Sequence, residues 1–270
     1  MPKYSQCQNI INEDPPVPRS RSLNPMPWNP AALCSLLVKI ADDWFYVPGW
    51  KKLDRILSRR ASACDDFYFI QIGANDGAMR DYLRDFILRF CWRGILVEPV
   101  PAYCARLRAN YRGQPGLIIE PLAIAEREEQ RDLFRICDGV EHLPAWCRGL
   151  ASFHLEVVRK HRFVVPDLER YIVRERVQCL PLGRLLEKHR VDRLDLLSID
   201  TEGHDYEVIK QIDFGTLRPG IVLYEHRHLS RPDRAACEHL LRSHGYRLAR
   251  RLGNTLAYSD YLEADYLEAD

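Results

Sequence analysis

The regular alternation of apolar strand-like runs with helix-like segments from Phe67 onward constrains the fold of this chain more than any other feature. The apolar runs are short and nearly continuous, which is typical of strands buried on both faces of a sheet, and the segments between them space apolar residues at helical intervals. The strand-like runs are 67–73, 94–98, 117–120, 194–200 and 221–225, and the helix-like ones are 79–91, 101–111, 182–189, 205–212 and 234–244. This order predicts an α/β fold with a mostly parallel, twisted sheet and helices on both faces. Two final strand-like runs meet at Gly253-Asn254 and predict an antiparallel C-terminal hairpin.

One sheet domain, residues 67–259, takes up most of the 270 residues. Residues 1–30 hold seven of the seventeen prolines beside few apolar residues, which favours a disordered tail. Residues 31–66 follow as a helical lead-in. Residues 260–270 form a second tail, in which Asp-Tyr-Leu-Glu-Ala occurs twice in succession.

Charge, cysteine content and hydropathy narrow the function classes. The 39 Lys and Arg residues balance 38 Asp and Glu, so bulk positive charge cannot drive nucleic-acid binding, and we predict no nucleic-acid partner. The nine cysteines include no Cys-x-x-Cys pair and several adjoin apolar runs, which favours buried free thiols in a reducing compartment. The longest nearly apolar run, 31–41, is about half of what a membrane span needs. We therefore expect a cytoplasmic protein without a membrane partner.

The first strand ends in the loop Gly73-Ala74-Asn75-Asp76-Gly77. In an open α/β sheet, ligands bind beyond the carboxyl ends of strands, and the two glycines let the backbone turn tightly and approach a ligand. A third glycine is missing where a dinucleotide fingerprint requires one. The carboxylate and amide side chains stand where a pyrophosphate would lie, which favours a cofactor with a cationic or amino-acid part. An ordinary tight turn is the alternative reading.

Polar side chains also follow the next strand ends. Glu98, with Pro99 after it, ends the second strand and can accept hydrogen bonds from both hydroxyls of a ribose; the alternative is a helix-capping carboxylate. Asp200, Glu202 and His204 follow an apolar strand within five residues, which is more than helix capping requires. Tyr224-Glu-His-Arg-His228 ends the neighbouring strand and forms a weaker fourth cluster.

Four stretches combine these motifs: Phe69-Ile-Gln-Ile-Gly-Ala-Asn-Asp-Gly77, Val97-Glu-Pro-Val-Pro101, Leu196-Leu-Ser-Ile-Asp-Thr-Glu-Gly-His-Asp-Tyr-Glu207 and Leu223-Tyr-Glu-His226. In their order and spacing, the chain resembles the FkbM family of S-adenosylmethionine-dependent methyltransferases from about residue 67 to 258. The resemblance implies a Rossmann-like methyltransferase fold in which the first and fourth parallel strands are neighbours. Gly73 and Asp200 would then face one another across one crevice.

The same resemblance implies roles for individual residues. Gly73, Ala74, Asn75 and Gly77, in the loop that includes Asp76, would hold the methionine part of S-adenosylmethionine. Glu98, followed by Pro99, would hold the ribose, and Ala123 would lie near the adenine. Asp200 and Glu202 would sit near the reacting methyl group. Residues 138–176 have no counterpart in a minimal methyltransferase sheet and are expected to form a lid or acceptor-binding insert.

These assignments lead to a mechanistic hypothesis. The family mostly methylates hydroxyl oxygens on sugars and natural-product scaffolds, so the resemblance implies an O-methyltransferase with a small-molecule or glycan-like acceptor. A hydroxyl acceptor must lose its proton, and we take His204 as the first candidate base and His226 as the second, with Asp200 orienting the base or the acceptor. A divalent metal on Asp200, Glu202, Glu225 and His226 is possible, but we do not favour it and assign no metal ligand.

Three rival functions stay open. Asp200-Thr-Glu202 resembles the acidic motif of metal-dependent nucleases and phosphoesterases, although that reading leaves Gly73–Gly77 and Glu98 unexplained. A nicotinamide oxidoreductase would need the missing third glycine. A non-catalytic cofactor-binding module remains compatible with all of these residues.

Overall fold

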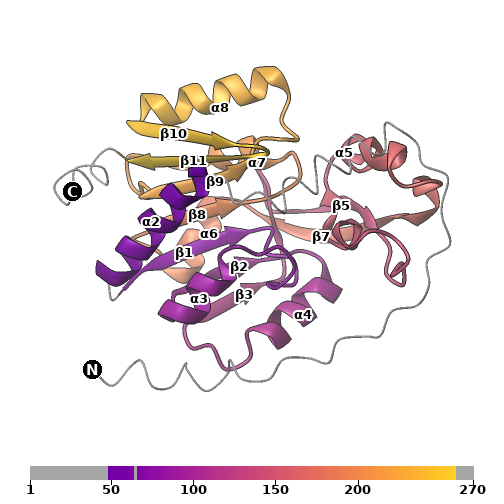
Figure 1. Ribbon diagram of the computed structural model, residues 1–270, viewed down its shortest axis with the longest axis horizontal. Helices are drawn as coiled ribbons and strands as arrows, with labels where there is room; N and C mark the ends of the chain where they lie inside the picture. Colours follow the sequence, from indigo (N-terminus) through magenta and orange to yellow (C-terminus); the bar gives the residue numbers. More distant parts are fainter. Residues whose placement is uncertain (1–47, 64–65, 260–270) are drawn as a thin grey trace. The chain divides into compact units, whose positions relative to one another are not determined.

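Seven strands form the main sheet, in the order β10-β11-β9-β8-β1-β2-β3 (Figure 1). The computed structural model describes residues 48–63 and 66–259, so the predicted tails, 1–30 and 260–270, and most of the helical lead-in lie outside it. The strands are β1 (Tyr68–Ile72), β2 (Arg93–Val97), β3 (Leu117–Glu120), β8 (Leu196–Ile199), β9 (Ile221–Glu225), β10 (Tyr246–Arg251) and β11 (Asn254–Ser259). The five strands from β3 to β9 run parallel, and β11 pairs antiparallel with β9 and β10. The predicted Rossmann-like α/β fold is confirmed, with β1 between β2 and β8.

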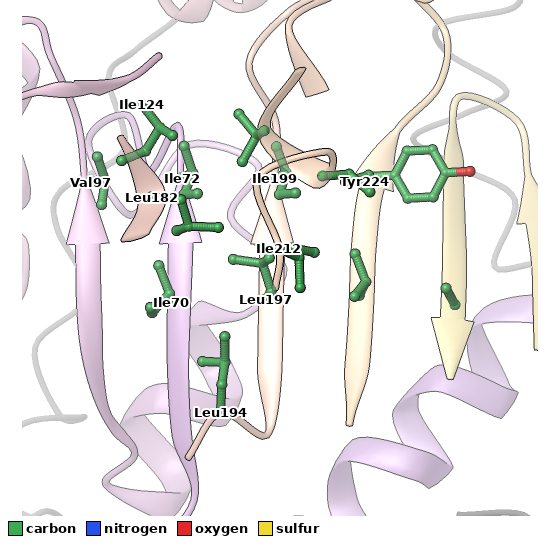
Figure 2. Close-up of a cluster of buried hydrophobic side chains, with 14 of the residues drawn as sticks. Ile70, Ile72, Val97, Ile124, Leu182, Leu194, Leu197, Ile199, Ile212 and Tyr224 are labelled. Atoms are coloured by element: carbon green, nitrogen blue, oxygen red, sulfur yellow. The ribbon is translucent and has the colours of Figure 1, made fainter. Parts of the chain in front are cut away.

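In the part of the chain that the structure describes, six helices cover the two faces of this sheet. They are α2 (Pro48–Ala63), α3 (Arg84–Phe90), α4 (Pro101–Asn110), α6 (Leu182–His189), α7 (Asp205–Ile209) and α8 (Arg231–Ser243). Successive strand residues point to opposite faces, so Phe69 packs with α2, α3 and α4 while Ile70 packs with α6, α7 and α8. Figure 2 shows the second face, where Ile70 and Ile72 of β1 lie beside Leu197 and Ile199 of β8. Burial on both faces explains why the strands read as unbroken apolar runs.

Several element boundaries differ from the sequence prediction, and two of the differences have clear local reasons. Helix α3 begins at Arg84 and not near Met79, because Arg80 adopts a φ of +58° and the Asp81 carboxylate accepts the Leu83 N–H in a turn. The final hairpin turns at Leu252-Gly253, because Arg251 pairs with Asn254. The N–H groups of the residues after β9 donate to the Gly253 carbonyl and hold that turn in place.

A second, four-stranded sheet was not predicted from the sequence. Its order is β4-β7-β5-β6, and its strands are β4 (Ala123–Ile124), β5 (Glu129–Ile136), β6 (Ala151–Ser152) and β7 (Ile172–Leu180). Between β5 and β7 lie the short helices η2 (Ala145–Gly149), α5 (Leu155–Arg159), η3 (Lys160–Phe163) and η4 (Leu168–Tyr171). This segment has its own apolar cluster, which includes Ile136, Cys147 and Leu168. Residues 138–176, called the insert below, therefore carry short helices and an apolar cluster beside this sheet.

Cysteine chemistry differs from the expectation at one position. Cys104, Cys137, Cys147, Cys179 and Cys237 are free, but Cys91 is disulfide-bonded. The prediction of free thiols was therefore wrong for Cys91.

Within the described segments, no helix combines the length and apolarity needed to cross a bilayer.

Candidate active site

The loop after β1 runs between the carboxyl ends of β2 and β8. Gly73 has a φ of +83°, and a Cβ atom there would lie only 1.8 Å from the Asp200 carbonyl oxygen. The N–H groups of Gly73 and Ala74 both donate to the Val97 carbonyl, at 2.9 and 3.0 Å. A side chain at Gly73 would force the loop away from both neighbours. Gly73 and Asp200 therefore lie side by side at the ends of the neighbouring strands β1 and β8.

Glu98 holds this loop from the end of β2. One carboxylate oxygen accepts the N–H of Asn75 at 2.8 Å, and the other accepts the N–H of Val100 at 2.9 Å, just before α4. Burial raises the pKa of Glu98 to about 7, although the two N–H donors act in the opposite direction. Glu98 therefore caps α4 and fixes the glycine loop together. Each oxygen keeps a second lone pair for another donor.

Asp76 and Gly77 serve the local turn. The Asp76 carboxylate accepts the N–H groups of Ala78 and Met79, at 2.9 and 2.7 Å. Gly77 has a φ of +68°, and a Cβ there would lie 2.5 Å from the side chains of both Leu107 and Tyr111. The structure thus gives these two residues turn-forming and packing contacts at the base of the loop.

The remaining two cofactor candidates of the sequence prediction lie near α4. Pro99 is partly buried between Glu98 and α4. Ala123 is buried in β4, where it pairs with Cys179 and packs in an apolar cluster with Val100. Ala123 therefore lies in the edge strand of the second sheet.

Four carboxylates gather where β8 and β9 end: Asp200, Glu202, Asp205 and Glu225. Asp205 is fully buried and joins the two strand ends, because it accepts the Thr201 hydroxyl at 2.8 Å and the Glu225 N–H at 3.0 Å. Burial raises the pKa of Asp205 to about 7. Asp205 stands in the first turn of α7, but its contacts bridge two strand ends and so go beyond helix capping.

Asp200 and Glu225 are destabilised as anions. Loss of solvent, followed by the charges of Glu202 and Asp205, raises the pKa of Asp200 well above its usual range, while Arg227 lowers it in part. The Asp200 side chain keeps contact with solvent, and the carboxylates around it oppose its ionisation. Burial and then the charges of Glu202 and Asp200 raise the pKa of Glu225 in the same way. Such crowding of like charges is characteristic of functional sites.

The histidine beside these carboxylates is His228 and not His226. His228 Nε2 lies 3.0 Å from Glu202 Oε2 and 3.8 Å from Glu225 Oε2. His226 is buried elsewhere, with Nδ1 2.8 Å from the Thr255 hydroxyl of β11. The structure therefore does not bring His226 together with Asp200 and Glu202. The sequence shows two histidines, one on each side of Arg227, but it does not show which of them faces the carboxylates. The backbone turn after β9 directs His228 toward the carboxylates and His226 toward β11.

His204 faces the insert. Its ring is buried, meets Phe153 edge-on at 5.1 Å and lies 6.1 Å from the His154 ring. Its Nε2 is 3.8 Å from Glu126 Oε1, and among the described residues neither ring nitrogen has a hydrogen-bond partner. Burial lowers the pKa of His204 to about 4, so the ring is neutral at neutral pH.

The insert contacts both loops of the site. The Ser152 hydroxyl donates to the Glu202 carbonyl at 2.7 Å. A Cβ at Gly149 would lie 2.5 Å from Asn75 Nδ2, so the end of η2 packs directly on the first loop. Sequence reasoning missed Gly149 and Ser152, because nothing in the local pattern links them to loops more than 45 residues away.

Comparison with known families adds to this geometry. A family model described as the methyltransferase FkbM domain matches residues 71–248. The chain belongs to the FkbM methyltransferase family. The match spans the main sheet from β1 into β10 and includes the whole insert, so the FkbM domain contains every candidate residue named above.

Several solved structures are similar to this chain at low sequence identity. A methyltransferase FkbM from Methylobacillus flagellatus KT is 11% identical, covers 72% of this chain and 44% of its own, and gives a TM-score of 0.45. A precorrin-6y C5,15-methyltransferase from Geobacter metallireducens GS-15 is 13% identical over 77% of this chain and 88% of its own, with a TM-score of 0.37. A fibrillarin pre-rRNA processing protein from Methanococcus jannaschii is 10% identical over 72% and 65%, with a TM-score of 0.36. No curated protein matches the chain.

Proposed function

We propose that this chain transfers a methyl group from S-adenosylmethionine to a hydroxyl oxygen on a sugar or natural-product scaffold. The observation that carries the proposal is the contact of Gly73 with Asp200 beside the Glu98-bound loop. This contact supports a site in which the glycine loop, the buried Glu98 carboxylate and the carboxylates around Asp200 share one edge of the sheet. Membership of the FkbM family supports the same activity.

The residues present fit the proposed cofactor. Gly73, Ala74, Asn75 and Gly77 would hold its methionine part, with Asp76 fixing the turn between them. Glu98, followed by Pro99, has one unused lone pair on each oxygen, which matches two ribose hydroxyls. Ala123 would adjoin the adenine. S-adenosylmethionine supplies an activated methyl group, so the chain mainly has to align the acceptor and accept its proton.

Asp200 is the better proton acceptor of the candidates. General-base catalysis favours a pKa near the working pH, and the neighbouring carboxylates move Asp200 upward toward it. Burial lowers the pKa of His204 to about 4, which makes that imidazole a weak base. We therefore propose Asp200 as the base and Glu202 as its neighbour at the acceptor. His204 becomes a neutral side chain facing the insert, and His226 a hydrogen-bond partner of β11.

The insert is proposed to select the acceptor. Its contacts with Asn75 through Gly149 and with Glu202 through Ser152 support a cover over both loops of the site. The proposed acceptor is a small molecule or glycan-like hydroxyl compound. An RNA acceptor is an alternative outcome of the same transfer assay.

We also propose that the protein acts in the cytoplasm. The five free cysteines favour a reducing compartment, whereas the disulfide at Cys91 favours an oxidising one. Mass spectrometry of the protein alkylated directly in its native cells tests this: an alkylated Cys91 thiol supports the cytoplasm, and an intact disulfide contradicts it.

Calorimetric titration with S-adenosylmethionine, S-adenosylhomocysteine and NAD tests the cofactor. We expect the first two to bind and NAD not to bind. Glu98→Gln should weaken binding of both by roughly thirtyfold, because a charged hydrogen bond is worth about 2 kcal/mol. The exposed Glu128→Gln on the second sheet side is the matched control and should bind normally. Failure of both sulfur compounds to bind overturns the proposal, and binding without any methyl transfer favours the non-catalytic module.

A further inference from the structure

Three metal-ligating side chains meet beside the proposed methyl-transfer site. Glu202, Glu225 and His228 each offer one ligand atom, and these three atoms lie within 4.8 Å of one another. The side chains come from the turns after β8 and β9, which Asp205 holds together through Thr201 and the Glu225 N–H. The ligand atoms are therefore supplied by fixed backbone positions and not by mobile surface side chains.

An ordinary ion pair accounts for only part of this arrangement. His228 Nε2 lies 3.0 Å from Glu202 Oε2, which is an ion-pair distance, but it is 3.8 Å from Glu225 Oε2. Among the described residues, Glu225 Oε2 is fully buried and has no hydrogen-bond partner. A buried carboxylate oxygen without a donor is costly, so a cation at this point would stabilise the site.

The distances suit a single bound ion. Ligands at about 2.1 Å from an octahedral metal are about 3 Å apart when adjacent, and the 3.0 and 3.8 Å separations approach that value. The mixture of imidazole and carboxylate favours a transition metal over Mg²⁺ or Ca²⁺. We propose that Glu202, Glu225 and His228 bind one divalent transition-metal ion. The metal set considered from the sequence, which was not favoured, contained His226, whereas His228 supplies the imidazole in the set proposed here.

The ion would hold the acceptor hydroxyl next to Asp200. This role rests on the proposed methyl transfer, whereas binding of the ion itself does not. In that reaction the acceptor oxygen forms the new bond to the methyl carbon, the sulfur–methyl bond breaks and its electron pair stays on sulfur. The hydroxyl proton goes to Asp200. A metal-bound hydroxyl loses its proton more easily, which would let a carboxylate act as sufficient base.

Titration of the chelator-treated full chain with Mn²⁺ alone, followed by electron paramagnetic resonance, tests the site. We expect one Mn²⁺ per chain, with Glu225→Gln and His228→Gln each weakening binding at least tenfold. Glu187→Gln, in an exposed ion pair on α6, and His244→Gln, at the exposed end of α8, are matched controls and should bind as the wild type does. A wild-type chain without a stoichiometric site, or variants that bind normally, overturns the proposal.

Two further readouts keep the test decisive if a variant fails to fold. The wild-type Mn²⁺ spectrum should show coupling to one imidazole nitrogen, and its absence also overturns the site. A parallel titration with S-adenosylmethionine separates the two proposals. Binding of S-adenosylmethionine without Mn²⁺ binding overturns only the metal site. Binding of Mn²⁺ without S-adenosylmethionine binding overturns only the proposed methyltransferase function.

Discussion

The two ends of strand β8 place buried or crowded carboxylates in opposite electrostatic settings. At the amino end, Asp195 is buried, accepts hydrogen bonds from Arg60 and Arg193 at 3.2 and 3.1 Å, and accepts the Tyr68 N–H at 3.0 Å. At the carboxyl end, Asp200 lies among Glu202, Asp205 and Glu225, and Arg227 offsets only part of their charge. Asp195 is compensated by cations from two elements, whereas Asp200 is opposed by carboxylates from two turns.

We propose that this difference separates a structural carboxylate, Asp195, from a functional one, Asp200. Compensated charge stabilises the fold, because removing either partner leaves the other buried or unsatisfied. Uncompensated charge lowers stability and persists where ligands or chemistry require it. Asp195 and Asp200 stand only five positions apart, on either side of β8. We therefore expect a substitution of Asp195 to change stability and one of Asp200 to change turnover.

The largest expected effect is on turnover, at the carboxyl end. Asp200→Asn should lower methyl transfer from labelled S-adenosylmethionine to a metabolite extract by about 10²–10⁴-fold, the usual contribution of a general base. The free energy of unfolding should not fall, because the substitution removes a repelled charge. Asp192→Asn, an exposed aspartate before β8, is the control. Unchanged turnover in Asp200→Asn would remove Asp200 from the mechanism.

The next largest effect is on stability, at the amino end. Asp195→Ala should lower the free energy of unfolding by about 3 kcal/mol, because two guanidinium groups and a backbone N–H lose their acceptor. Affinity for S-adenosylhomocysteine should not change. Urea unfolding measured beside Asp192→Ala checks this. If Asp195→Ala lost affinity for S-adenosylhomocysteine without losing stability, the amino end of β8 would take part in ligand binding and the comparison would fail.

A smaller effect is expected from pH. Burial raises the pKa of Glu98 in the folded chain to about 7, above its unfolded value, so its contribution to stability is present at low pH and is lost as the pH rises through 7. Glu98→Gln should therefore reduce the fall in unfolding free energy between pH 6 and pH 8 by about 1 kcal/mol. Urea unfolding of both proteins at the two pH values measures the difference. An identical pH dependence would mean that Glu98 ionises normally.

The smallest effect is expected where the insert meets the first loop. Gly149→Ala adds a Cβ 2.5 Å from Asn75 Nδ2 and 3.2 Å from Met79 Cε, and both are ends of side chains that can move. Affinity for S-adenosylhomocysteine should fall by roughly threefold, or about 0.7 kcal/mol. Gly183→Ala is the matched control, because no described atom lies within 4 Å of its Cβ. Equal affinities in the two variants would separate the insert from cofactor binding.

The sequence predicts which candidate residues lie together where polar residues directly follow apolar strands. Gly73, Glu98 and Asp200 each follow an apolar run, and the carboxyl ends of parallel strands meet at one edge, so their proximity could be predicted. The choice between His226 and His228 depends on how the chain turns after Glu225, where the N–H groups of His226 and Arg227 both donate to the Gly253 carbonyl.

The second sheet was missed for a different reason. β5 carries charged residues at four of its eight positions and β7 at three of its nine, and the interior of β7 buries only Val177 and Cys179, so neither strand reads as an apolar run. Their stability comes from pairing with each other, and long-range pairing is not visible in local periodicity. Contacts of Gly149 and Ser152 with the site depend on that same pairing.

Hydrogen–deuterium exchange with and without S-adenosylhomocysteine tests most directly whether the carboxyl end of the sheet is the functional end. We predict that the ligand slows exchange at the backbone amides of 73–79, 98–100 and 200–205 and leaves those of 191–196 unchanged. Protection confined to 191–196, or none at all under conditions where calorimetry detects binding, would contradict the assignment of the site.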